Sequence, residues 1–308
     1  MVGGGRCMLS KRDIQRELGK GIAIVPFKEE NLKDNSINLS AGNYAWGTIS
    51  HEYYYNTGKN GGPLYFLEEE IPLSERKHYK ARYIQAGNSV IVNHGHRKVI
   101  LLFPHATTYV ETLEVLSTSG NIGGTCHSKV GTAAQGIGHI GTMMGPNYSG
   151  NCFVPLHNPT DKLIELPVGE TFMSVVFNYL DTPVREQNAT TGGHTDKFSS
   201  LGIHATTEEL NDLNQDWKRS HKAVIEMMNA DNNFKQFKKH LLRQRISRVF
   251  SKRNIITGCA LIAVFVLLAV LAAYVDGKNG TTVWSDRFWT VMAAGIVVYI
   301  LQILLPRR

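Results

Sequence analysis

The chain has 308 residues and a formal net charge of +7, with 43% hydrophobic and 19% charged residues. Eight Lys and Arg residues between positions 235 and 253 carry this surplus. The remainder is therefore close to neutral, and its charge does not indicate nucleic-acid binding. The four cysteines show no paired or C-x-x-C spacing, which argues against a disulfide scaffold and against a cysteine zinc site. No apolar stretch follows the N-terminus, so a cleavable signal peptide is not expected.

The first predicted elements are a short helix and a short strand. Ser10 is placed to cap a helix beside Asp13, and Ile14 and Leu18 follow at helical spacing. The apolar run IAIVPF at residues 22–27 then predicts a strand that Pro26 stops.

From residue 35 to residue 177 the pattern predicts an all-β domain without helices. Short apolar or alternating runs are separated by Gly, Pro, Asn and Asp, which is typical of a barrel or sandwich. The runs are SINLSAG, YAWGTI, PLYFLEE, YIQAGNSVIVN, KVILLFP, TLEVLSTSG, NCFVPLHN, KLIELPVGE and TFMSVVFNYL.

A polar tail and a helical stalk are predicted next. Residues 181–203 are rich in Gly, Ser and Thr, which indicates a mobile tail or a plain linker. Thr206 and Glu209 form a capping-box signature, residues 229–233 suggest a break, and residues 234–250 form a basic amphipathic helix. These features predict a cytosolic domain over residues 1–204 and a basic helical stalk over residues 205–253.

The last part of the chain, residues 254–308, predicts a transmembrane hairpin. Ile255–Val275 and Phe288–Leu305 contain 21 and 18 residues without charge, long enough to span a bilayer as helices. The alternative is a pair of buried core helices, although a helix of a soluble protein normally keeps a polar stripe. Basic residues flank the hairpin on its outer ends. Both termini are therefore expected in the cytoplasm, with the connecting loop outside the inner (plasma) membrane.

Three parts of the sequence resemble the dCTP deaminase family. The opening, Leu9-Ser10, Asp13-Ile14, Leu18, Gly21-Ile22, Pro26-Phe27, Leu32 and Ser36-Ile37-Asn38-Leu39, is similar in order and spacing to the start of these enzymes. The later parts are Tyr148-Ser149-Gly150 with Asn158, and Leu166-Pro167-Val168-Gly169-Glu170 with Ser174-Val175-Val176-Phe177. The resemblance covers about residues 8 to 200. It implies a mainly β, dUTPase-like (dCTP deaminase-like) barrel, usually a trimer, that binds pyrimidine deoxynucleotide between subunits.

Departures from the family pattern predict that the domain is not an enzyme. The family's phosphate-binding arginines correspond to Gly124 and Lys129, and its catalytic Glu corresponds to Pro155. The Asp of the related dUTPases corresponds to Gly145, and no acid lies between residues 117 and 160. The zinc deaminase signature is also absent, and His94 and His96 are interpreted as surface residues, so neither a metal nor another cofactor is expected.

The resemblance implies that the ligand-binding site is retained although these acids are absent. The glycine-flanked segment GGTCHSKVGTAAQG is interpreted as an anion-binding loop, the alternative being a flexible turn. Base contacts are expected from the neighbouring strand and from the polar tail acting as a lid. The candidate ligand-binding residues are Thr125, His127, Ser128, Lys129, His139, Asn147, Tyr148, Lys197 and Phe198.

Three functions follow as hypotheses. The first is a membrane effector, pore- or channel-forming, that a nucleotide or short oligonucleotide controls. In layout it is similar to effectors of bacterial antiviral defence. Its partners would be that ligand, the bilayer, further copies of the chain (three by family resemblance, or another symmetry) and a nucleotidyltransferase-type enzyme that makes the signal. The second is a tethered dCTP deaminase or dUTPase that takes its acid from Glu111, Glu114 or Asp196. The third is a membrane scaffold without a ligand.

Overall fold

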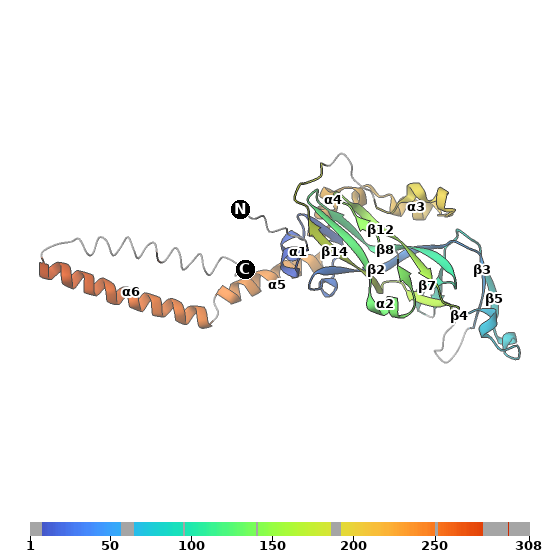
Figure 1. Ribbon diagram of the computed structural model, residues 1–308, viewed down its shortest axis with the longest axis horizontal. Helices are drawn as coiled ribbons and strands as arrows, with labels where there is room; N and C mark the ends of the chain where they lie inside the picture. The colour runs from blue at the N-terminus through green and yellow to red at the C-terminus, as the bar shows by residue number, and fades with distance from the viewer. Residues whose placement is uncertain are drawn as a thin grey trace. The chain divides into compact units, whose positions relative to one another are not determined.

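The computed structural model describes residues 8–56, 65–94, 96–139, 141–185, 192–249, 252–279 and 295. The chain divides into two compact units, Met1–Lys235 and Gln236–Arg308. The first unit is mainly β, as expected, and is built on one eight-stranded sheet (Figure 1). Its strands are β1 (Ile22–Val25), β2 (Ser36–Gly47), β8 (Ala106–Thr118), β9 (Ile122–Ser128), β10 (Gly138–His139), β11 (Met143–Met144), β12 (Ser149–Asn158) and β14 (Thr171–Tyr179).

The sheet is antiparallel and curls towards closure. Its hydrogen-bonded path runs β10-β12-β8-β2-β14-β9-β11, and β1 pairs with β8 beside this path. Strand β10 also contacts β9, so the two ends of the path approach each other. Buried residues of the central strands, such as Leu39, Val110 and Phe177, fill the interior. β10 therefore contacts both β9 and β12, although these two strands are far apart in the strand order.

Two three-stranded sheets extend the first unit. One consists of β13 (Ile164–Pro167), β7 (Arg97–Leu102) and β6 (Ile91–His94), and β7 is apolar and buried from Val99 onwards. The other consists of β4 (Tyr65–Phe66), β3 (His51–Tyr55) and β5 (Lys80–Ile84). Figure 1 shows this second sheet at the end of the β domain opposite to α1 (Lys11–Glu17).

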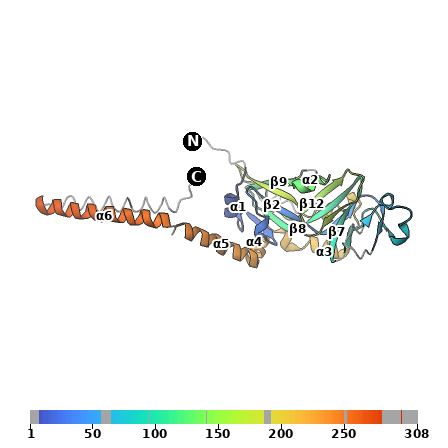
Figure 2. The same ribbon diagram turned by 90° about the horizontal axis from the view of Figure 1, so that it is seen from below.

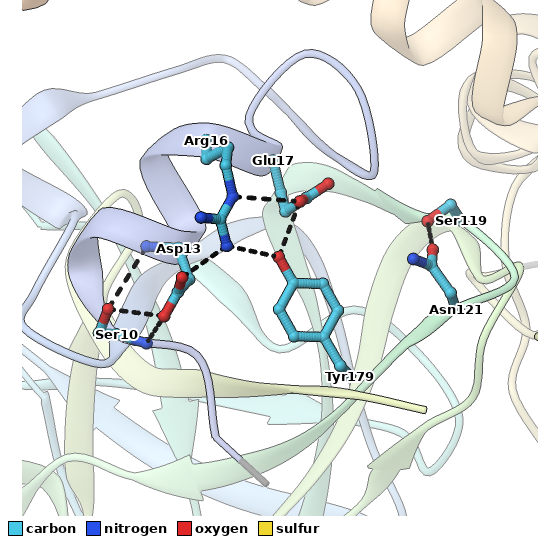
Figure 3. Close-up of polar contacts among 7 residues, drawn as sticks. All are labelled: Ser10, Asp13, Arg16, Glu17, Ser119, Asn121 and Tyr179. Atoms are coloured by element: carbon cyan, nitrogen blue, oxygen red, sulfur yellow. Dashed lines mark hydrogen bonds and ion pairs between the residues drawn. The ribbon is translucent and has the colours of Figure 1, made fainter. Parts of the chain in front are cut away.

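Polar contacts attach α1 to the last strand of the sheet (Figure 3). Ser10 and Asp13 form the expected capping box, and the hydrogen bond from Ser10 lowers the pKa of Asp13. Arg16 contacts Asp13 at 2.6 Å and donates to the Tyr179 hydroxyl at 3.3 Å. That hydroxyl donates in turn to Glu17 at 2.7 Å, so the first helix is bonded to the end of β14.

Within the described part of the chain, the next three helices follow the sheet, and the second of them packs onto it. They are α3 (Thr207–Leu213), α4 (His221–Ala230) and α5 (Asn232–Val249). Val224 and Met228 of α4 are buried, α4 contacts β1, and Phe234 packs edge-on against Phe27 at 5.3 Å. The predicted break lies at Asp231, and the predicted capping box of Thr206 is present. The N-terminal part of the expected stalk therefore belongs to the first unit.

The second unit contains α6 (Lys252–Asn279), which covers the first apolar stretch. No helix within the described residues combines the length and the apolar character needed to cross a membrane. Seven large apolar side chains of α6 between Val264 and Tyr274 are exposed in the single chain. Gly295 is the one described residue of the second apolar stretch, and a Cβ there would lie 3.1 Å from the ring of Phe265. The two apolar stretches thus approach each other at this point.

Candidate functional site

The segment expected to be a glycine-rich loop is instead a strand and a short helix, which corrects that prediction. Residues up to Ser128 belong to β9, and α2 (Val130–Ala134) begins directly after Lys129. Gly124 lies within the strand, where a Cβ would be 2.7 Å from the Val176 carbonyl of β14 and would clash with it. Glycine here permits close pairing of two strands rather than a flexible turn. In the view of Figure 2, α2 lies on the side of the sheet opposite to α3 and α4.

Four of the predicted residues meet at this junction, which we call the β9–α2 face: Thr125, His127, Ser128 and Lys129. The Thr125 hydroxyl and Nε2 of His127 are 3.0 Å apart on the exposed side of β9. The Lys129 amine donates to the Thr171 hydroxyl, and within the described residues it has no acidic partner. An ammonium, an imidazole and hydroxyls without a carboxylate favour an anion.

Apolar side chains border the β9–α2 face. Met143 of β11 is paired with Thr125 and is 87% exposed, and Val130 of α2 is 86% exposed. Both side chains are therefore almost fully exposed to solvent in the single chain. The face is thus polar at its centre and apolar at its border.

Tyr148 does not present a free edge to a ligand, which corrects the expectation for it, whereas the amide nitrogen of Asn147 is engaged by the protein. Asn147 has φ 58°, a left-handed conformation that Asn tolerates, and its amide donates to the Val184 carbonyl at 3.1 Å. The buried Tyr148 hydroxyl donates to the Asn151 carbonyl at 2.6 Å, and burial raises the pKa of Tyr148 well above its usual value. His139 pairs with Leu156 through the backbone, and its side chain lies outside the described residues.

The polar tail was expected to be mobile, but from residue 192 onwards it folds against the sheet. Gly192 and Gly193 donate their backbone N–H groups to the Ser149 and Asn151 carbonyls at 2.6 and 2.7 Å. We call Gly192, Gly193 and His194 the strap. Residues 186–191 lie outside the described part of the chain.

Phe198 is a core residue, not the exposed base-stacking group that was predicted. Its ring is 4% exposed, 4.8 Å from the ring of Trp46 and 5.5 Å from that of Phe153. The neighbouring Lys197, in the short 3-10 helix Thr195–Lys197, remains exposed. A surface groove of about 580 Å³ lies beside this cluster and is lined by Thr195, Phe198, Ser199, Gly202, Ile203, His204, Ala205, Thr206 and Leu210.

The two positions that the resemblance aligns with family acids lie within or shortly before β12. Pro155 is on β12 opposite Tyr109 of β8. Gly145 lies between β11 and β12, and its carbonyl accepts from the Thr118 hydroxyl at 3.3 Å. Of the alternative acids, Asp196 is exposed beside the strap.

The other two alternative acids are both buried on β8 but differ in their partners. Glu114 accepts from the backbone N–H and the hydroxyl of Ser40 at 2.7 and 2.8 Å. Glu111 is 1% exposed, and neither of its oxygens has a hydrogen-bond partner among the described residues; the same holds for Oδ1 of Asn151. Burial raises the pKa of Glu111 well above its usual value, and the charge of Lys218 only partly opposes this.

Sequence reasoning named Glu111 only as an alternative acid and did not single out Asn151. A charged residue inside the apolar alternation of β8 was the available signal for Glu111. An Asn within a strand gives no comparable signal, because its role depends on a bulge in the β8–β12 pairing between Asn151 and Phe153.

The described residues contain no cluster of three His, Cys, Asp or Glu side chains that could hold a metal ion. His94, considered as a possible ligand, contacts Glu165 at 2.9 Å. His96 is an exposed residue in the turn that leads into β7.

Comparison with known proteins finds similarity to solved structures only. No protein-family profile and no curated protein matches the chain. The dCTP deaminase of Agrobacterium tumefaciens is similar with a TM-score of 0.35 and 14% identity, over 58% of this chain and 50% of that enzyme. The dUTPase of Staphylococcus bacteriophage 80alpha is similar with a TM-score of 0.25 and 16% identity, over 32% of this chain and 87% of the phage enzyme. The dUTPase of phage phi11 of S. aureus gives 0.25 and 13% over the same shares. The chain thus aligns with half the length of the deaminase.

Proposed function

We propose that the chain is a membrane effector in which a dCTP deaminase-like β domain binds a nucleotide and controls a two-helix membrane hairpin. The observation that carries the nucleotide-binding part is the β9–α2 face. It gathers Thr125, His127 and Lys129 at the segment that resembles the family's phosphate-binding motif. Lys129 takes no acidic partner within the described residues, so its charge is available to a phosphate.

The border of the face supports assembly of several copies. Met143 and Val130 expose apolar side chains beside the polar centre, and in the proposed assembly a second copy covers them. A second copy that covers Met143 would bring its own residues close to Thr125. We therefore propose a homo-oligomer with nucleotide bound at this border, a trimer by family resemblance.

The membrane part of the proposal rests on the sequence of the second unit. Ile255–Val275 has no charge over 21 residues, and eight basic residues precede or begin α6. Basic residues next to an apolar stretch favour the cytoplasmic side of a bilayer. In an oligomer the hairpins would come together and form a pore that opens or closes in response to the nucleotide. The proposed role is in antiphage defence. A nucleotidyltransferase-type enzyme would make the nucleotide signal.

A tethered dCTP deaminase or dUTPase is the second candidate, and Glu111 is the observation that favours it. A buried carboxyl group with a raised pKa is a frequent property of general acids. Pro155 and Gly145 have no acidic side chain at the positions where the resemblance expects the catalytic acids. This candidate therefore needs catalytic residues in a different arrangement.

The deciding experiment is mass spectrometry of nucleotides that co-purify with the full chain in mild detergent, followed by incubation with dCTP and dUTP. We expect a stoichiometric nucleotide or oligonucleotide and no turnover of either triphosphate. Turnover would replace the effector by the enzyme. If no nucleotide co-purifies and no added nucleotide binds, the scaffold without a ligand would be the remaining hypothesis.

A further inference from the structure

Helix α5 carries a row of positive charges that no acid of the helix balances. It contains six Lys and Arg residues and no Asp or Glu, and Asp231 and Asp276 are the nearest acids before and after it in the sequence. Lys235, Lys239 and Arg243 follow one another at intervals of four residues and are exposed. Like charges at this spacing lie side by side on a helix and repel each other, so α5 favours a negatively charged partner.

Two exposed apolar side chains lie among these cations. Leu242 is 58% exposed and Ile246 is 49% exposed, and at a spacing of four residues they share one side of α5. The buried Phe237 lies about 140° from Leu242 around the helix, because successive residues are about 100° apart. Leu242 and Ile246 therefore do not belong to the side of α5 that carries the buried Phe237.

The cations border this apolar pair. Lys238 and Lys239 precede Leu242 by four and three residues, and Arg243 precedes Ile246 by three, spacings at which side chains on a helix are neighbours. We call Lys238, Lys239, Leu242, Arg243 and Ile246 the α5 face, and all five belong to the second unit. The face combines exposed apolar groups at its centre with positive charge at its sides.

This combination fits an anionic bilayer surface better than a nucleic acid. A nucleic acid would engage the cations through its phosphates and leave the apolar pair in water. A bilayer offers phosphate groups at its surface and acyl chains directly beneath them, which take up apolar side chains that lie between cations. The position in the chain agrees, because α6 with its apolar stretch begins at Lys252, three residues after the end of α5 at Val249.

We propose that the α5 face docks onto the bilayer and recognises anionic phospholipid headgroups. Lys238, Lys239 and Arg243 contact the phosphates, and Leu242 and Ile246 lie at the boundary with the acyl chains. The inference rests on the proposed membrane effector and specifies the class of lipid that its membrane part requires. Each Lys or Arg beside an anionic surface favours the docked state about fivefold, so the three together favour it on the order of a hundredfold.

Spin labels on the full chain, reconstituted into vesicles, test the docking. A label on Leu242→Cys is compared with one on Gln244→Cys, which lies nearly opposite on the helix, in a chain whose native cysteines are replaced. In an equal mixture of phosphatidylcholine and phosphatidylglycerol, we expect the label at position 242 to be protected from a water-soluble nickel chelate and the label at position 244 to remain accessible. In phosphatidylcholine alone the protection at position 242 should be lost.

Two matched variants show whether the charges of the α5 face cause this protection. The triple change Lys238→Gln, Lys239→Gln, Arg243→Gln should abolish the protection at position 242 in the lipid mixture. A control removes the same amount of charge from three exposed lysines of the β domain and should keep the protection: Lys77→Gln, Lys80→Gln, Lys162→Gln. Circular dichroism of each variant checks that the chain is folded.

The outcomes separate this inference from the function on which it rests. A label on Val264→Cys in α6 reports whether the apolar stretch enters the bilayer. If it enters while position 242 is equally accessible or equally protected in both lipids, recognition of anionic lipid is wrong and the membrane part stands. If position 264 stays accessible in both lipids, the proposed hairpin is wrong, and protection at position 242 in the phosphatidylglycerol mixture alone decides the docking of α5. If position 242 is never protected and the chain in detergent binds a short DNA duplex that the triple variant does not bind, the face belongs to a nucleic acid.

Discussion

Lys129 is the residue on which the proposed phosphate binding at the β9–α2 face depends most. Its amine is held by the Thr171 hydroxyl, and its backbone N–H donates to the Phe172 carbonyl at 3.1 Å. We expect Lys129→Ala to weaken binding of the co-purifying nucleotide about 10- to 100-fold, as loss of a charge-assisted hydrogen bond does. Isothermal titration measures the change. The exposed Lys162→Ala serves as the control, and equal affinity in both variants would contradict the assignment of the face.

We expect Glu111 to make the stability of the β domain depend on pH. Burial raises its folded pKa above the ordinary value of 4.5, so its carboxyl group contributes stability that is complete below pH 4.5 and is lost as pH rises. The charge of Lys218 opposes this shift. Tyr148 and Cys152, which interact with Glu111, remain neutral because burial raises their pKa values too. Glu111→Gln does not titrate and should escape this loss.

The expected result is a melting temperature that matches wild type near pH 4.5 and exceeds it increasingly towards pH 8. The gain should correspond to about 1–3 kcal/mol, the usual cost of a buried polar group without a partner. Differential scanning fluorimetry of both proteins from pH 4.5 to 8 gives the difference directly. A constant difference across this range would show that Glu111 does not carry the penalty.

Residues whose role is local were predictable, and residues whose role is tertiary were not. Ser10 and Thr206 cap helices through contacts three residues away, so their spacing alone predicts them. Phe198 lies in a polar stretch, and its burial against Trp46, more than a hundred residues earlier, leaves no local pattern. The same applies to Asn151, whose environment arises from the strap and the bulge.

Among the elements, the strap depends on the absence of side chains. A Cβ at Gly192 would lie 2.5 Å from the Asn151 carbonyl and 2.6 Å from the Tyr148 hydroxyl. We expect Gly192→Ala to displace the strap and to lower the free energy of unfolding by about 1–3 kcal/mol, as overpacking does. Chemical denaturation measures this. Gly131→Ala in α2, where a Cβ meets nothing within 4 Å, should leave stability unchanged or slightly raised.

The contact between α6 and Gly295 defines the proposed hairpin. Because a Cβ at Gly295 would lie 3.1 Å from the tip of the Phe265 ring, and so about one ring length from the Cβ of residue 265, cysteines at 265 and 295 should be joined by a short bifunctional thiol cross-linker. The experiment uses a chain whose native cysteines are replaced. After cleavage of the connecting loop, gel electrophoresis detects the cross-link because the two fragments stay joined. A Phe265→Cys, Gly277→Cys pair on α6 alone is too far apart along the helix to react. Failure of the first pair to cross-link would argue against the hairpin.

The elements themselves were largely predicted because strands with one buried face alternate in sequence. The runs that became β2, β8, β12 and β14 combine this alternation with flanking turn residues. β9 was mistaken for a loop because Gly123 and Gly124 normally interrupt strands, whereas Gly124 here permits close approach to β14. α2 was missed because five residues are too few to show a helical period.

For the whole molecule, the boundary at residue 235 separates a domain that should fold alone from the part proposed to enter the membrane. A chain that ends at Lys235 keeps Phe234 against Phe27 and the cover of β1 by α4. We expect it to remain in the supernatant after ultracentrifugation of a lysate and to melt cooperatively, while the full chain sediments with membranes and needs detergent. Sedimentation of both alike would remove the support for the hairpin as an anchor.

The bond between the first helix and the last strand also sets an order of events during synthesis. α1 finds Tyr179 only after 162 further residues have been made, and β1 waits still longer for Met228. Contacts of such separation form late and slowly. Met228 precedes the apolar stretch from Ile255 by only 27 residues, so the proposed membrane part is synthesised before these slow contacts of the β domain are complete. If the proposed membrane insertion occurs, variants that slow the pairing of β14 with α1 would enter it with an incompletely folded β domain.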